Sequence, residues 1–189
     1  MGRYERVSVA GPAEPPRLLL EGRPGSGKTT AVARLVELLR GEGLAVTGFL
    51  TRELRERGER VGFTLETLDG RRGMLAHVSI RGGRRVGRYG VTHNDLERLA
   101  IPALHAHADV VVVDELGKME LTSAAFRDAV IALLDRPTAL VATVHARPDP
   151  FTDELKRRRS IAVLQLTRSN RDELPGEIAR RLRGGGRRA

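Results

Sequence analysis

The sequence of 189 residues contains no cysteine and no tryptophan, and its aromatic residues are four Phe and two Tyr. Without cysteine there is no disulfide framework, thiolate nucleophile, iron–sulfur cluster or cysteine-ligated zinc, and a reducing, cytoplasmic setting is expected. The core must therefore be aliphatic. Proteins that stack nucleobases on aromatic platforms are a poor match.

Long apolar runs are also absent. The apolar runs that are present, such as Val110–Val113, are short, far below the ~20 residues that a membrane-spanning helix needs. The N-terminal MGRYERVSVAGPAEPP has no apolar signal core. Neither export nor a membrane is expected. The length predicts one domain over residues 17–183, with an irregular leader over 1–16 and a flexible Gly/Arg tail over 184–189. A monomer is the favoured state.

Lysine is the scarce cation. Of 33 basic residues, 30 are Arg and three are Lys, at positions 28, 118 and 156. The formal charge of +9 is concentrated in residues 52–88 and 147–189, whereas residues 89–146 are net acidic. In a chain that uses Arg almost everywhere, each lysine is a candidate for a specific role.

Hydrophobic periodicity predicts strands that alternate with helices, and hence a three-layer α/β sandwich around a largely parallel sheet. Thr92 and Asp95 have the spacing of a capping box, and Pro102 predicts a kink in the helix that follows. Residues 52–91 are predicted to be a β-rich insertion. The predicted strands are 17–21, 45–51, 60–68, 73–78, 109–114, 138–145 and 161–167, and the predicted helices are 29–40, 92–107, 123–135 and 171–183.

The segment GRPGSGKT, residues 22–29, matches the phosphate-binding P-loop between a predicted strand and a predicted helix. Its glycines allow backbone N–H groups to surround a phosphate, Lys28 would reach the β- and γ-phosphates, and the Thr29 hydroxyl would bind Mg²⁺. The alternative is a glycine-rich turn that binds nothing.

The apolar run Val110–Val113 ends in two acids, Asp114 and Glu115. The end of such a buried strand lies at the sheet edge where the P-loop is expected. Asp114 is then a candidate Mg²⁺ ligand, and Glu115 a candidate base for an attacking water, which favours hydrolysis over phosphoryl transfer. The alternative is a strand that ends in a solvated turn.

Three further groups are weaker candidates. Lys118 would approach the phosphates, pair with Glu115 or Glu120, or be a surface lysine. His145 or Thr143, at the end of the predicted strand 138–145, would sense the γ-phosphate, unless the histidine is structural. A polar, proline-containing stretch is a candidate lid that supplies an arginine finger, or else a solvated face, and its arginines are Arg147, Arg157, Arg158 and Arg159.

The sequence resembles the THEP1-type nucleoside-triphosphatases over residues 17–182. The motifs are GRPGSGKTT (22–30), GFLTRE (48–53) with RVGF (60–63), GRYGV (87–91), VVDELGKMEL (112–121) and NRDEL (170–174). The resemblance implies a RecA-like P-loop fold and Mg²⁺-dependent hydrolysis of ATP, GTP and other nucleoside triphosphates with broad base tolerance. It implies that the following residues bind nucleotide: Gly22, Arg23, Pro24, Gly25, Ser26, Gly27, Lys28, Thr29, Thr30, Val112, Val113, Asp114, Glu115, Leu116, Gly117, Lys118 and Met119.

Two other functions use the same phosphate site. In a small-molecule or nucleotide kinase, Thr51, Arg52 and Glu53 would bind the phosphoryl acceptor. A nucleic-acid-associated ATPase would use the basic segments, but the sequence has no base-reading motif, few aromatics and an acidic segment beside the site, which argue against nucleic acid as a partner.

Overall fold

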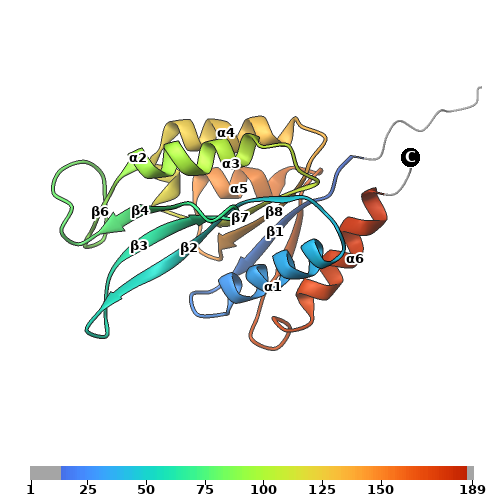
Figure 1. The fold of residues 1–189 in the computed structure, drawn as a ribbon, viewed down its shortest axis with the longest axis horizontal. Helices are drawn as coiled ribbons and strands as arrows, with labels where there is room; N and C mark the ends of the chain where they lie inside the picture. The colour runs from blue at the N-terminus through green and yellow to red at the C-terminus, as the bar shows by residue number, and fades with distance from the viewer. Residues whose placement is uncertain (1–13, 187–189) are drawn as a thin grey trace, which may run out of the picture.

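A computed structural model describes residues 14–186 (Figure 1). Residues 1–13 of the predicted leader and residues 187–189 of the predicted tail lie outside the described residues. Residues 14–16 have no regular secondary structure.

The described residues form one sheet of nine strands, in the order β5-β6-β4-β3-β2-β7-β8-β1-β9. Strands β2, β7, β8, β1 and β9 pair with one another in parallel, and β3, β4, β6 and β5 extend the β2 edge with antiparallel pairing. The strands are β1 Arg17–Gly22, β2 Val46–Glu56, β3 Glu59–Thr67, β4 Arg72–His77, β5 Arg85–Val86, β6 Tyr89–Val91, β7 Val110–Leu116, β8 Ala139–His145 and β9 Ala162–Gln165.

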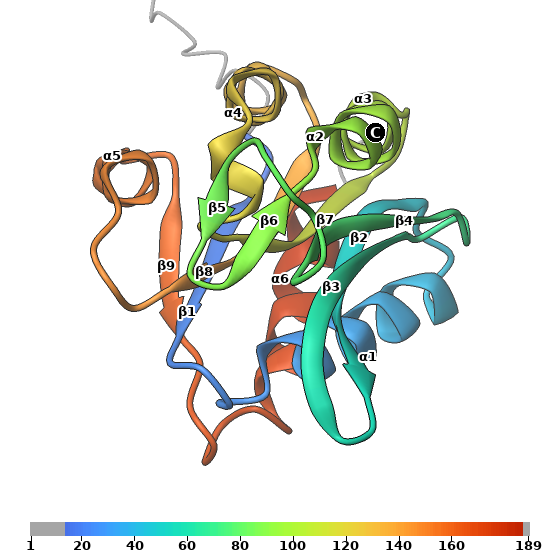
Figure 2. The same ribbon diagram turned by 90° about the vertical axis from the view of Figure 1, so that its left-hand side faces the viewer.

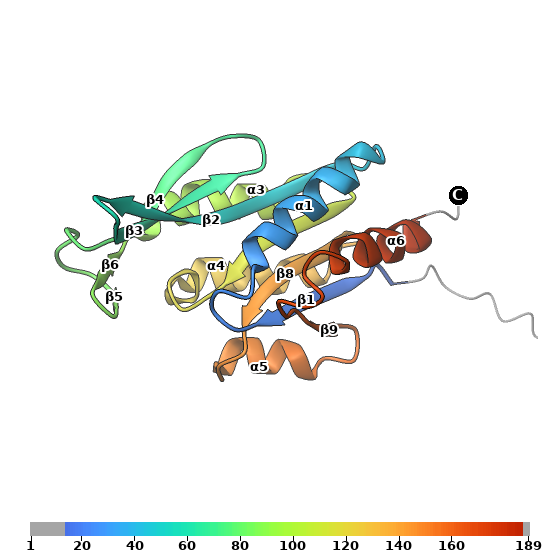
Figure 3. The ribbon, with the colours of Figure 1, turned by 90° about the horizontal axis from the view of Figure 1, so that it is seen from below.

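Helices cover both faces of the sheet. Helices α1 and α6 lie together on one face, and α3 and α4 lie on the other (Figures 1 and 3). No helix in residues 14–186 is long and apolar enough to cross a membrane. The helices are α1 Lys28–Gly41, α2 His93–Asp95, α3 Ile101–His105, α4 Ala124–Leu134, α5 Pro150–Arg157 and α6 Leu174–Gly186, with a π-helical turn at Leu96–Ala100 and a 3₁₀ turn at Glu120–Thr122.

Strand β7 shows how the aliphatic core is divided. Its side chains alternate, so that Val110 and Val112 pack under α1 and α6, whereas Val111 and Val113 pack under α3 and α4. A strand with helices on both faces is apolar throughout, as the sequence pattern indicates. The predicted three-layer α/β P-loop fold is confirmed.

The region 52–91 belongs to the same sheet. Strand β2 continues five residues beyond the predicted end at Thr51 and pairs with β3, with Thr51 opposite Leu65. A short hairpin, β5–β6, was not predicted, and it adds to β4 through His77 and Gly90. The antiparallel half is therefore an extension of the parallel half.

The predicted capping box is wrong. Thr92 occupies the N-cap position of α2, but its side chain makes no capping hydrogen bond. The Asp95 carboxylate instead accepts from the Met74 backbone N–H at 2.8 Å and from Arg98 at 2.9 Å. The Asp95 side chain thus forms a tertiary contact with β4 instead of the local capping contact. Near the kink predicted at Pro102, a π-helical turn lies directly before α3, and Pro102, which has no N–H to donate, occupies the first turn of α3.

The stretch predicted as a polar lid is largely helical. Asp149 caps α5, accepting from the backbone N–H groups of Phe151 at 3.0 Å and Thr152 at 3.2 Å, and Pro150 fits the first turn. Helix α6 begins at Leu174, three residues after the predicted start, and continues to Gly186, into the predicted tail.

Candidate active site

The P-loop connects β1 to α1 through a left-handed glycine. Gly27 has φ 94° and occupies the N-cap position, and no side chain caps the helix. Only glycine adopts this conformation without strain. The first N–H groups of α1 therefore lack a side-chain acceptor, an arrangement that suits an anion.

Two buried polar side chains complete the P-loop. The Lys28 side chain is 8% exposed, and its ammonium donates to the Gly22 carbonyl at 3.2 Å. Within the described residues the buried Ser26 hydroxyl has no hydrogen-bond partner. Gly22 permits this packing, because a Cβ there would lie 2.7 Å from Ser26 Oγ and 2.9 Å from the Leu166 carbonyl. A bound phosphate would satisfy both the hydroxyl and the cation.

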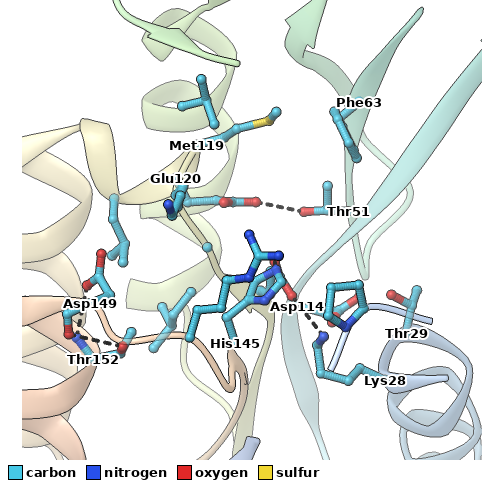
Figure 4. Close-up of a pocket in the computed structure, with 18 of the residues that line it drawn as sticks. Lys28, Thr29, Thr51, Phe63, Asp114, Met119, Glu120, His145, Asp149 and Thr152 are labelled. Carbon is cyan, nitrogen blue, oxygen red and sulfur yellow. Dashed lines mark hydrogen bonds and ion pairs between the residues drawn. The ribbon is translucent and has the colours of Figure 1, made fainter. Parts of the chain in front are cut away.

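Asp114 lies near the end of β7, at the same sheet edge as the P-loop (Figure 4). Its side chain is 2% exposed and accepts from Thr143 Oγ1 at 2.5 Å. Burial raises the pKa of the Asp114 carboxyl, although the hydroxyls of Thr143 and Thr29 both lower it. A cation beside Asp114 would offset the cost of burying its charge.

Glu115 lies between Lys28 and His145. Its Oε2 is 3.5 Å from Lys28 Nζ, and its Oε1 is 3.3 Å from His145 Nε2. His145 Nδ1 is buried and has no hydrogen-bond partner in the described part of the chain. We call Lys28, Thr29, Asp114, Glu115 and His145 the floor of the site, since β1, β7 and β8 bring them to one edge.

Glu120 is a buried carboxyl that the sequence analysis named only as a partner for Lys118. It is 3% exposed and accepts a hydrogen bond from Thr51 Oγ1 at 3.2 Å. Burial, followed by the charge of Glu115, raises the pKa of Glu120 to about 8. Near neutral pH the group is therefore largely protonated. The signal that points to it is an acid within the apolar end of VVDELGKMEL.

The floor opens into a cavity of about 500 Å³ (Figure 4). The cavity runs from the P-loop, past the end of β7, to the antiparallel strands and the loop before α5. Its lining residues are Pro24, Gly25, Lys28, Thr29, Thr51, Glu53, Arg60, Phe63, Val86, Gly87, Tyr89, residues 114–121, His145, Arg147, Pro148, Asp149 and Thr152.

Four side chains from β2, β3 and β6, namely Glu53, Arg60, Phe63 and Tyr89, form what we call the outer wall of the cavity. Arg60 pairs with Glu53 at 2.7 Å, donates to the Tyr89 hydroxyl at 3.0 Å and lies 5.3 Å from the Phe63 ring centroid. The hydrogen bond from Arg60 lowers the pKa of both Glu53 and Tyr89. Three motifs that are separate in the sequence, GFLTRE, RVGF and GRYGV, thus meet on one surface.

The predicted nucleotide-binding residues fall into three groups. Those that line the cavity are Pro24, Gly25, Lys28, Thr29, Asp114, Glu115, Leu116, Gly117, Lys118 and Met119. Gly22, Arg23, Ser26, Gly27 and Thr30 lie in the P-loop and the start of α1 but outside this lining. Val112 and Val113 are buried in the core on opposite faces of the sheet, so their side chains face no cavity.

The weaker candidates also differ in whether they lie at the cavity or form the predicted ion pair. Lys118 is exposed and, within residues 14–186, forms no ion pair with Glu115 or Glu120, so the predicted pairing is wrong. Arg147 lines the cavity. Arg157, Arg158 and Arg159 lie at and beyond the end of α5 and do not line it.

No group of three or more His, Cys, Asp or Glu side chains in the described residues is arranged to hold a metal ion. Thr29 and Asp114 offer one hydroxyl and one carboxylate. This small, hard oxygen set fits Mg²⁺, which normally keeps several waters and takes further ligands from substrate phosphates.

The nine-stranded mixed sheet, its flanking helices and the loop between β1 and α1 define a P-loop α/β protein. A family model described as NTPase matches residues 17–179, so the chain belongs to this NTPase family, as its motifs predict.

Named relatives support the assignment. The chain is 40% identical over 165 residues to the nucleoside-triphosphatase THEP1 of Thermotoga sp. (strain RQ2). The aligned region covers 86% of this chain and 92% of the relative. Two solved structures match with a TM-score of 0.79 each. THEP1 from Aquifex aeolicus is 34% identical, over 88% of this chain and 98% of that one. A human cancer-related nucleoside triphosphatase is 35% identical, over 93% and 100%.

Proposed function

We propose that this protein hydrolyses ATP, GTP and other nucleoside triphosphates to the diphosphate and phosphate, with broad base tolerance. The observation that carries the proposal is the position of Glu115. Its carboxylate lies at the floor of the cavity, next to Asp114 and within 3.5 Å of the P-loop lysine. The family and its named relatives support the same reaction.

The P-loop would bind the β- and γ-phosphates. In the part of the chain that the structure describes, no side chain caps the N–H groups at the start of α1, and the Ser26 hydroxyl has no hydrogen-bond partner, so both are available as donors. Lys28 would exchange its contacts with the Gly22 carbonyl and Glu115 for the phosphate oxygens. The ammonium already donates a charge-assisted bond to the Gly22 carbonyl, and phosphate oxygens would add their negative charge to that interaction.

Thr29 and Asp114 would hold Mg²⁺. When bound, the ion would supply positive charge to the phosphate oxygens. Thr143, which donates to Asp114, would fix the orientation of the carboxylate. The substitution Asp114→Asn should therefore raise the Mg²⁺ concentration needed for half-maximal activity.

Glu115 would act as the general base. A water oxygen attacks the γ-phosphorus, the bond from that phosphorus to the β,γ-bridging oxygen breaks, and Glu115 accepts the proton of the water. The bridging oxygen leaves on the nucleoside diphosphate. His145, 3.3 Å from Glu115, would orient the carboxylate toward the water.

Phosphate release from a panel of ATP, GTP, CTP and UTP tests the proposal. Each substrate is assayed with Mg²⁺ and with EDTA, and with and without RNA or single-stranded DNA. Comparable Mg²⁺-dependent rates across the panel are expected. No phosphate release from any of the four would overturn the proposal, and strong stimulation by nucleic acid would favour the nucleic-acid-associated ATPase instead.

A kinase is the second candidate, because the cavity extends past the floor to the outer wall. Thr51 and Glu53 line this extension, whereas Arg52 does not line it and pairs with Glu66 at 2.8 Å. An acceptor with hydroxyl groups would fit between Thr51 and Glu53. The test is whether labelled γ-phosphate appears as free phosphate or on an added nucleoside, nucleotide or sugar.

A further inference from the structure

We infer that the guanidinium group of Arg171 is a stacking platform for the nucleobase, placed on the side of the P-loop opposite Glu115. The inference rests on the proposed function, since it assumes a nucleotide in the P-loop. It gives a role to the NRDEL segment, residues 170–174, which the phosphate site leaves unexplained.

The order of the strands determines in which direction the nucleoside of a bound triphosphate extends from the P-loop. Strand β1, which carries the P-loop, lies between β8 and β9. Asp114, Glu115 and His145 come from β7 and β8, so the γ-phosphate end of the substrate belongs on that side. A triphosphate that crosses the end of β1 then directs its nucleoside toward the β9 side, where the loop 166–173 follows β9 (Figure 2).

Arg171 lies directly against the P-loop on that side. A Cβ added to Gly27 would be 3.0 Å from Arg171 Cδ and 3.5 Å from Nη1, so the side chain packs against the glycine itself. The side chain is 46% exposed, and its ion pair with Asp172, at 3.9 Å, is long. The stem and one edge of the guanidinium thus lie against Gly27, and about half of the side chain remains exposed to a ligand.

The loop that carries Arg171 is well held. Asn170 Oδ1 accepts from the Thr167 backbone N–H at 2.8 Å, and its Nδ2 donates to the Gln165 carbonyl at 2.8 Å. The Leu166 N–H donates to the Glu21 carbonyl at 2.7 Å, which ties the loop to the end of β1. Asn170 therefore shapes the loop, and Arg171 is the side chain that it presents to the P-loop.

Stacking on a guanidinium plane suits this chain and its proposed substrates. An Arg plane attracts the π-face of any base, so it binds ATP, GTP, CTP and UTP without reading their hydrogen-bonding edges. Phe49, Phe63, Phe126, Tyr89 and Phe151 lie outside the loop 166–173. In a chain with few aromatics, arginine is the residue that supplies a flat surface there.

Calorimetric titration distinguishes the contribution of the base to binding affinity from that of the phosphates. The ligands are ADP, GDP, CDP, UDP and, as the matched ligand without a nucleoside, inorganic pyrophosphate, all with Mg²⁺. The proteins are the wild type, Arg171→Ala, Arg171→Lys and a control, Arg168→Ala, which removes an exposed arginine of the same loop. Thermal unfolding of each variant checks that the fold is intact.

Arg171→Ala should weaken all four nucleoside diphosphates by roughly 10-fold, the purines most, because base stacking has about this strength. Pyrophosphate affinity should change less than about 2-fold. Arg171→Lys, which keeps the charge without the plane, should resemble Arg171→Ala, and Arg168→Ala should resemble the wild type.

Two outcomes would overturn the platform while leaving the proposed function intact. Equal weakening of ADP and pyrophosphate, with rescue by Arg171→Lys, would make Arg171 a phosphate ligand. Unchanged affinity of Arg171→Ala for every diphosphate would remove any role in binding. A wild-type protein that binds none of the ligands and releases no phosphate would overturn the proposed function itself, and the inference with it.

Discussion

The floor and the outer wall face each other across one cavity, but they differ in how their polar groups are satisfied. On and beside the floor, the Ser26 hydroxyl and His145 Nδ1 are buried without a partner among residues 14–186, and Asp114 is buried with a raised pKa. On the wall, Arg60 satisfies Glu53 and Tyr89 directly.

The difference separates a surface built for a ligand from one that is complete by itself. Buried polar groups without partners cost free energy that folding alone does not recover, so the Ser26 hydroxyl beside the floor and His145 Nδ1 on it are atoms that a bound group would complete. Within residues 14–186 the third such atom, Arg17 Nε, lies at the other end of β1. Among the described residues, no buried side-chain polar atom of the outer wall lacks a hydrogen-bond partner. The chemistry is therefore expected at the floor, and the wall is expected to shape the cavity.

The largest effect should come from Lys28→Ala. The substitution removes the cation that would contact the β- and γ-phosphates, so turnover should fall by roughly 10³-fold or more and nucleotide binding should weaken. Phosphate release and calorimetric binding measure the two effects. Arg34→Ala, which removes an exposed cation from the same helix, is the matched control and should behave as the wild type.

Glu115→Gln should separate chemistry from binding. The amide preserves the size of the side chain but accepts no proton, so kcat should fall by roughly 10² to 10⁴, the range for a general base, with little change in nucleotide affinity. Wild-type hydrolysis by this variant would show that Glu115 does not activate the water.

Glu120 lies where the floor and the wall meet, and its effect should appear in stability. Its pKa is raised from 4.5 to about 8, so the folded state keeps a proton that the unfolded state loses. The free energy of unfolding should therefore fall as pH rises from 4.5 to about 8, by up to ~1.4 kcal/mol per pH unit from this group. Glu120→Gln removes this contribution.

Urea unfolding of Glu120→Gln and the wild type at pH 5, 7 and 9 measures the effect. The stability of the variant relative to the wild type should increase with pH, by on the order of a few kcal/mol between pH 5 and pH 9. Glu59→Gln, in an exposed position on β3, is the control. A constant difference between Glu120→Gln and the wild type would show that folding does not raise the pKa of Glu120.

The smallest effect should come from the outer wall. Arg60 is 43% exposed, so Arg60→Ala should cost about 1 kcal/mol or less in stability and change phosphate release only a few-fold. Arg72→Ala, on β4, is the control. A loss of activity as large as that of Glu115→Gln would place chemistry on the wall and contradict the comparison.

The sequence predicted the position of the floor because each of its parts has a local signature. GRPGSGKT is continuous, and an apolar strand that ends in Asp114 must bring it to the edge where parallel strands end. The fold class followed from the same alternation of strands and helices. The roles of these residues remain predictions.

The wall and its surroundings were not predictable in the same way. Glu53, Arg60 and Tyr89 meet only through the antiparallel register of β2, β3, β4 and β6, which the local patterns do not specify. Asp95 was misassigned for a similar reason, because its partner, the backbone of Met74, is distant in the sequence. The burial of Glu120 was not predicted either, because the apolar end of its motif does not by itself distinguish this acid from a solvent-exposed one.

Hydrolysis of ATP in ¹⁸O-labelled water tests the central claim most directly. If water activated at the floor attacks the γ-phosphorus, the label must enter inorganic phosphate and be absent from ADP. Label in ADP would mean attack at the β-phosphorus, and γ-phosphate transferred to an acceptor without label would mean a kinase. Either result would contradict the account.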